Sequence, residues 1–106
     1  SLKFLEMTYE LLKKNDIKMS LGIYPWPAQI MHDKEDSKVV SLMKNFCLNR
    51  CEYFFNNFPN FFKKIKDSNK ETIILNYYIK GDVHYNALGN NILFENFMKI
   101  FKINNL

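Results

Sequence analysis

Two apolar runs of strand length constrain the fold of this chain more than any other feature. Residues 17–24 and 71–79 each have the length and the composition of a buried strand. Apolar residues with helical spacing precede the first run at 1–15, separate the two runs at 36–58, and follow the second at 87–102. Such alternation is typical of parallel strands joined by helical crossovers, so the sequence predicts an α/β layered fold.

The segment after the first run is a candidate binding region. Pro25 and Pro27 end the run because proline cannot donate to a strand ladder, and residues 28–34 are expected to form a loop. In an open α/β sheet, ligands bind beyond the carboxyl ends of the strands. We therefore expect Trp26 and His32 to line a substrate pocket. The competing interpretation makes Trp26 a hydrophobic plug and His32 a solvated loop residue.

The richest chemical pattern lies at residues 80–91, Lys-Gly-Asp-Val-His-Tyr-Asn-Ala-Leu-Gly-Asn-Asn. It is expected to form a turn between the second strand and the last helix, with Asn86 as the helix cap. A two-residue spacing on an extended backbone directs the side chains of Asp82 and His84 to one face. The carboxylate then accepts from the Nδ1–H group of the imidazole, and Nε2 is left free to act as a base. We expect this pair at the carboxyl edge of the sheet, with Nε2 exposed to a cleft.

The block Gly-Asp-Val-His-Tyr-Asn-Ala-Leu-Gly-Asn resembles the last conserved block of the SGNH (GDSL-type) hydrolase superfamily. That block is usually written Asp-x-x-His, whereas this chain has Asp-x-His, a variant similar to the branch of sugar O-acetyl esterases and acyltransferases. The resemblance implies a partial flavodoxin-like, three-layer α/β/α fold with parallel strands. Residues 1–106 would form a single domain or the C-terminal part of an SGNH-type domain.

The same resemblance implies a function. Asp82 and His84 would supply the Asp and the His of a Ser-His-Asp triad, in which His84 is the general base and Asp82 orients it. The parent protein would be a serine esterase or O-acyltransferase that acts on acyl, and above all acetyl, esters of a small molecule or a carbohydrate. Neither a cofactor nor a metal is implied by this chemistry.

A serine nucleophile is not recognisable in the sequence. In the family it lies in a Gly-Asp-Ser-like turn after a strand, and both Asp36-Ser37 and Asp67-Ser68 lack the glycine and the preceding strand. The glycine and asparagine of the family's oxyanion hole have no block here either. We therefore expect the isolated chain to be inactive and to be a piece of a longer protein. Its exposed sheet edge would pair with the rest of the parent chain or with a second copy.

Two other interpretations remain open. In the first, the chain is a noncatalytic α/β interaction module in which Asp82 hydrogen-bonds locally and His84 is a turn residue. In the second, His32 joins Asp82 and His84 as metal ligands, but three loop residues are weak support for such a site.

Composition argues against two classes of partner. The formal net charge is +4, but the lysines are dispersed and Arg50 is the only arginine, so nucleic-acid binding is not expected. No apolar run has the length of a membrane span.

Cys47 and Cys51 fall four residues apart in an expected helix, where disulfide geometry is awkward, and no zinc pattern includes them. We expect two buried free thiols, which favour a reducing compartment.

Overall fold

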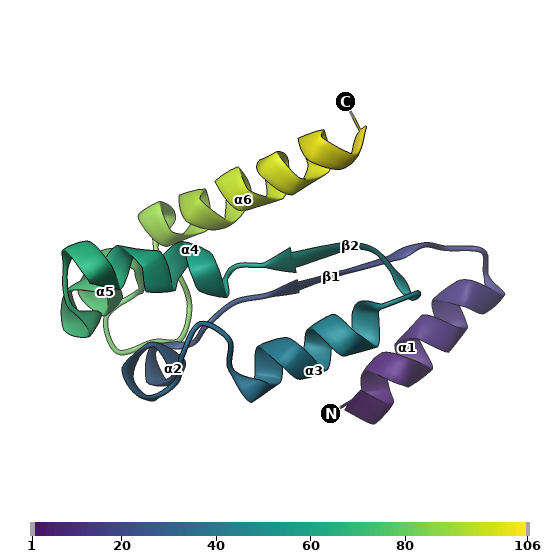
Figure 1. Ribbon diagram of the computed structural model, residues 1–106, viewed down its shortest axis with the longest axis horizontal. Coiled ribbons are helices and arrows are strands. Elements are labelled where there is room, and N and C mark those ends of the chain that lie inside the picture. The colour runs from purple at the N-terminus through teal and green to yellow at the C-terminus, as the bar shows by residue number, and fades with distance from the viewer. Residues whose placement is uncertain (1, 106) are drawn as a thin grey trace.

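The chain adopts a mixed α/β fold around a two-stranded parallel sheet (Figure 1). The computed structural model describes residues 2–105. In chain order the elements are α1 (Leu2–Lys14), β1 (Met19–Ile23), α2 (Pro27–His32), α3 (Lys38–Cys47), β2 (Cys51–Asn56), α4 (Phe58–Phe62), the 3-10 helix η1 (Lys63–Asp67), α5 (Lys70–Tyr77) and α6 (Ala87–Asn105). Within the sheet, Met19 pairs with Cys51 and Ile23 with Asn56, so both carboxyl ends lie at one edge.

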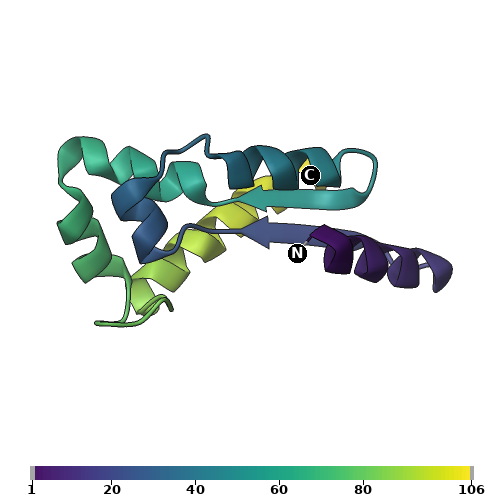
Figure 2. The same cartoon turned by 90° about the horizontal axis from the view of Figure 1, so that it is seen from below.

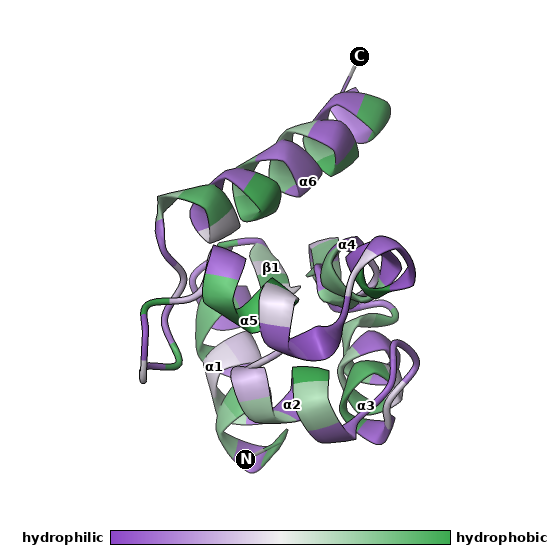
Figure 3. Cartoon of the chain, turned by 90° about the vertical axis from the view of Figure 1, so that its left-hand side faces the viewer, coloured by the Kyte–Doolittle hydropathy of each residue, from purple (hydrophilic) through white to green (hydrophobic). Residues whose placement is uncertain are grey.

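Helices cover both faces of this small sheet (Figure 2). On one face, Met19 packs with Phe46 of α3 and with the inner side chains of α1. On the other face α6 crosses over β2, where the ring of Phe97 lies 4.9 Å from that of Phe55. An end-on view shows α2 and α3 on one side of the molecule and α6 on the opposite side (Figure 3). Among residues 2–105, no helix is long and apolar enough to span a bilayer.

A buried hydrogen-bonded chain fixes α6 to the ends of both strands. The Nδ2 atom of Asn96, which is 8% exposed, donates to Oδ1 of Asn57 at 2.9 Å. The Nδ2 atom of Asn57 in turn donates to the carbonyl oxygen of Ile23 at 3.0 Å. Because buried amides require partners, these contacts set the position of α6 relative to the carboxyl edge of the sheet.

The first apolar run forms a strand as predicted, but the prediction for the second run is wrong. Residues 70–77 form helix α5, not a strand. Its N-cap is Asn69, whose Oδ1 accepts from the backbone N–H of Thr72 at 2.8 Å. Ile73 is buried against the core on the inner face of α5. The cap and this packing outweigh the strand preference of the β-branched and aromatic residues in the run.

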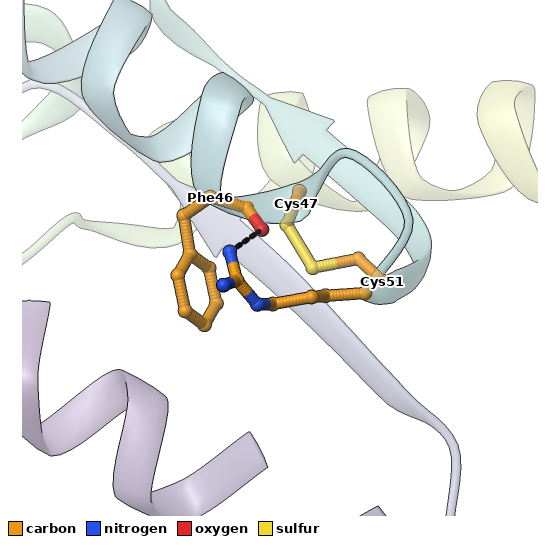
Figure 4. Close-up of a disulfide and its surroundings, with 4 residues drawn as sticks. Phe46, Cys47 and Cys51 are labelled. Atoms are coloured by element: carbon orange, nitrogen blue, oxygen red, sulfur yellow. Dashed lines mark hydrogen bonds between the residues drawn. A yellow bond between two sulfur atoms is a disulfide. The ribbon is translucent and has the colours of Figure 1, made fainter. Parts of the chain in front are cut away.

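The expected long helix at 36–58 is also wrong, because the segment forms α3 and then β2. Asn49 has φ of 64°, in the left-handed region that asparagine tolerates better than most residues, and the chain turns there. Cys47 and Cys51 form a disulfide across this turn (Figure 4). The expectation of two free thiols is therefore wrong as well. It assumed that both cysteines lie in one helix, whereas the turn brings their Cα atoms to 4.8 Å.

Residues 27–32 form the short helix α2 where the sequence predicted a loop. Pro27 occupies the first turn, where the absent N–H group costs nothing because that position has no helical acceptor. The Oε1 atom of Gln29 accepts from the backbone N–H of Trp26 at 2.9 Å and so satisfies one free donor at the helix start.

Candidate functional site

Asp82 and His84 contact each other in the turn between α5 and α6. The Oδ1 atom of Asp82 lies 2.7 Å from Nδ1 of His84. The same oxygen accepts from the backbone N–H groups of Val83 at 2.6 Å and of His84 at 3.3 Å. The hydrogen bond from His84, and next the one from Val83, lower the pKa of Asp82 below its ordinary value. The predicted contact between the carboxylate and Nδ1 is thus confirmed, although a helix and not a strand precedes the turn.

The backbone of the turn closes on itself. The N–H group of Ile79 donates to the carbonyl of His84 at 2.9 Å, and the N–H group of Asp82 donates to the carbonyl of Ile79 at 3.0 Å. Gly81 has φ of 75°, a conformation that residues with a Cβ atom rarely adopt. These contacts hold Asp82 and His84 in one arrangement.

Two tyrosines anchor the base of the turn to the carboxyl end of β1. Tyr78 and Tyr85 form an isolated antiparallel bridge. The hydroxyl of Tyr85 donates to the carbonyl of Pro25 at 2.9 Å, and the hydroxyl of Tyr78 also donates to that carbonyl. Burial raises the pKa of Tyr78 to about 12 and also raises the pKa of Tyr85, so both act as neutral donors. Since Pro25 lies two residues beyond Ile23, the turn lies at the carboxyl edge of the sheet, as expected.

The end of the turn is fixed by the start of α6. The predicted cap is confirmed, because Oδ1 of Asn86 accepts from the N–H group of Gly89 at 3.0 Å. The Nδ2 atom of Asn86 also donates to the carbonyl of Asn76 at 2.8 Å. A Cβ atom on Gly89 would lie 2.2 Å from the carbonyl oxygen of Tyr77 and 2.6 Å from the ring of Tyr85. Gly89 therefore lets α6 approach α5 closely enough to support the turn, a role that the sequence did not reveal.

The two expected pocket residues lie in different surroundings. Trp26 is 54% exposed and lines a cavity of about 330 Å³ beside the carboxyl end of β1. His32 is the last residue of α2, is exposed, and is not among the residues that line this cavity. Within residues 2–105, neither a hydrogen bond nor an ion pair joins His32 to Asp82 or His84.

The Nε2 atom of His84 is the atom of the site that is free to accept a proton. The side chain of His84 is 72% exposed, and within residues 2–105 its Nε2 atom forms no hydrogen bond. Ser37 is not presented to it, because Ser37 is 1% exposed and its Oγ accepts from the N–H group of Val40 as the cap of α3. An imidazole oriented in this way can take a proton from a hydroxyl group that is brought to Nε2.

The described residues do not assemble a metal centre. In the part of the chain that the structure covers, no group of three or more His, Cys, Asp or Glu side chains is placed to hold a metal ion.

Comparison of the chain with protein-family models, with curated proteins and with solved structures finds no match in any of the three.

Proposed function

We propose that Asp82 and His84 are the orienting acid and the general base of a serine esterase or O-acyltransferase of the SGNH type. The observation that carries this proposal is the 2.7 Å contact between Asp82 Oδ1 and His84 Nδ1 in a turn anchored to the carboxyl edge of the sheet. In the reaction, a serine attacks the acyl ester while His84 takes the serine proton. His84 then protonates the leaving alcohol, and water or a sugar hydroxyl removes the acyl group from the serine.

The proposal includes a larger, flavodoxin-like three-layer domain of which this chain is the C-terminal part. Its further parallel strands would pair with the outer edge of β1, which in residues 2–105 has a paired neighbour only on the β2 side. The turn that carries Asp82 and His84 lies on this outer side of β1 (Figure 2). Strands added there would bring the nucleophile and the oxyanion hole towards His84, and would cover an imidazole that is largely exposed in this chain.

The alternative is a noncatalytic α/β interaction module, and one observation favours it. Asp82 accepts from two backbone N–H groups of its own turn, so the carboxylate also has a purely structural role. In that case the contact with His84 is a consequence of the turn and the imidazole has no reaction to catalyse.

Ester turnover separates the two functions. The coding sequence is extended upstream of Ser1, and kcat/KM for a chromogenic acetyl ester is measured for the wild type, for His84→Ala and for Asp82→Asn. The proposal predicts that His84→Ala lowers kcat/KM about a thousandfold or more, and that Asp82→Asn lowers it too. Lys80→Ala, an exposed change in the same turn, is the control and keeps the wild-type value. Equal turnover in the wild type and His84→Ala would contradict the catalytic function and favour the noncatalytic interaction module.

A further inference from the structure

We infer that the cavity between α2 and α3 binds the apolar chain of the acyl group, so that the substrates are esters of short fatty acids longer than acetate. The identification of the bound group as the acyl part of an ester substrate rests on the proposed function. The capacity of the cavity to bind an apolar chain rests on the geometry of the described residues alone.

The cavity is built wholly by elements of this chain. It has a volume of about 330 Å³ and lies where β1 ends, with residues of both α2 and α3 in its lining. Its lining is contributed by β1, α2, α3, α4 and the β1–α2 connection: Ile23, Tyr24, Trp26, Gln29, Val39, Met43 and Phe58. Apolar and aromatic side chains with a single amide are the lining expected for a small apolar ligand, and the volume lies at the lower end of the range for ligand pockets. A short chain therefore fits this site better than a large one.

One aromatic contact links the cavity to the candidate catalytic turn. The ring of Tyr24, which lines the cavity, lies 5.3 Å from the ring of Tyr85 in an edge-on arrangement. Tyr85 directly follows His84 and bonds to Pro25, the residue after Tyr24. The cavity and the Asp82–His84 turn thus share the carboxyl edge of β1. An acyl chain in the cavity would therefore lie at the same edge of the sheet as the turn, with Tyr24 between them.

Gln29 supplies the polar group that such a ligand requires. Its Oε1 atom is occupied by the backbone N–H of Trp26. Within residues 2–105 its Nε2 group donates to no acceptor, so it is available to an ester or carboxyl oxygen. Gln29 is half-buried, and the bond between its Oε1 atom and Trp26 orients this amide in the wall of the cavity.

The intrinsic fluorescence of Trp26, the only tryptophan of the chain, reports on the cavity directly. The chain is titrated with hexanoate and, separately, with acetate at equal ionic strength. We expect hexanoate to cause a saturable blue shift, because an apolar chain displaces water from the exposed ring. Acetate should cause no shift. Met43→Gln places an amide in the wall at nearly constant volume and should weaken hexanoate binding about tenfold. Met7→Gln, the same substitution on the exposed face of α1, should bind as the wild type does.

The outcomes separate this inference from the proposed function. Absence of a saturable shift with hexanoate, or equal affinities for Met43→Gln and the wild type, overturns the inference even if the extended protein hydrolyses acetyl esters. The inference is also overturned if, without ligand, the emission of Trp26 shifts with protein concentration and sedimentation velocity shows a dimer. A second copy of the chain then fills the cavity. Hexanoate binding that is weakened by Met43→Gln supports the site. It does so even if turnover is independent of His84 and the proposed function fails.

Discussion

The Oδ1 atom of Asp82 lies 2.7 Å from Nδ1 of His84, and it also accepts from the backbone N–H groups of Val83 and of His84. Three donors therefore converge on one carboxylate oxygen, and they favour its ionised form. The imidazole is held with Nδ1 towards the carboxylate and Nε2 towards solvent, which is the orientation that a general base needs.

The lowered pKa of Asp82 predicts a specific response to acid. Since the pKa in the folded chain lies below the ordinary 3.8, the carboxylate stabilises the fold above that ordinary value. This contribution is lost as the pH falls through the lower, folded pKa. His84→Ala removes the largest cause of the shift, so the pKa of Asp82 should rise while the bond from Val83 remains. The carboxyl carbon NMR shift of Asp82, followed from neutral to acid pH, measures the pKa of Asp82 in the wild type and in His84→Ala. The same pKa in the two proteins would show that the imidazole does not contact the carboxylate.

The local features of the site could be predicted because each depends on neighbouring residues. The spacing of Asp82 and His84 directs both side chains to one side, and Asn86 stands where a helix cap is needed. The first strand is marked by its apolar run and by the prolines that end it. None of these inferences needs a contact that is distant in the sequence.

The remaining features depend on contacts that the sequence does not show. Residues 71–79 have strand-forming side chains, yet residues up to Tyr77 are helical, and the cap at Asn69 and the packing of Ile73 stabilise this helix. The apolar residues keep helical spacing past Asn49, where the chain turns, so the sequence does not indicate that β2 begins after this residue. The anchoring of Tyr85 on Pro25 joins residues sixty positions apart, and no local pattern indicates it.

Gly89→Ala should destabilise the chain strongly. The added Cβ atom would meet the backbone carbonyl of Tyr77 at 2.2 Å, so α6 must move away from α5. Overpacking of this kind costs about 1–3 kcal/mol or more in the free energy of unfolding, which urea denaturation measures. Gly22→Ala is the matched control, because its Cβ atom would meet its nearest neighbour, Cβ of Phe55, at an ordinary 3.8 Å. Equal losses for the two variants would mean that α6 does not approach α5 as closely as described.

The Cys47–Cys51 disulfide should stabilise the connection between α3 and β2. It closes a short loop in which Arg50 also donates to the carbonyl of Phe46 at 3.0 Å (Figure 4). Loop-closure entropy for so short a loop corresponds to about 2 kcal/mol. We expect a reductant to lower the urea midpoint of the wild type by a corresponding amount. A variant with serine at both positions should be insensitive to the reductant, and a wild-type midpoint that does not change on reduction would show that the bond contributes nothing to stability.

The most direct test of the central claim is labelling by a fluorophosphonate, which reacts with activated serines. The sample is the protein expressed from the coding sequence extended upstream of Ser1. It is labelled as the wild type, as His84→Ala and as the control Lys80→Ala, and mass spectrometry locates the modified residue in each. If His84 is the general base, one serine outside residues 1–106 is labelled in the wild type and the control, and the label is lost in His84→Ala. Labelling that persists at the same rate in His84→Ala, or the absence of any labelled serine in the wild type, would contradict the assignment of Asp82 and His84 to a catalytic triad.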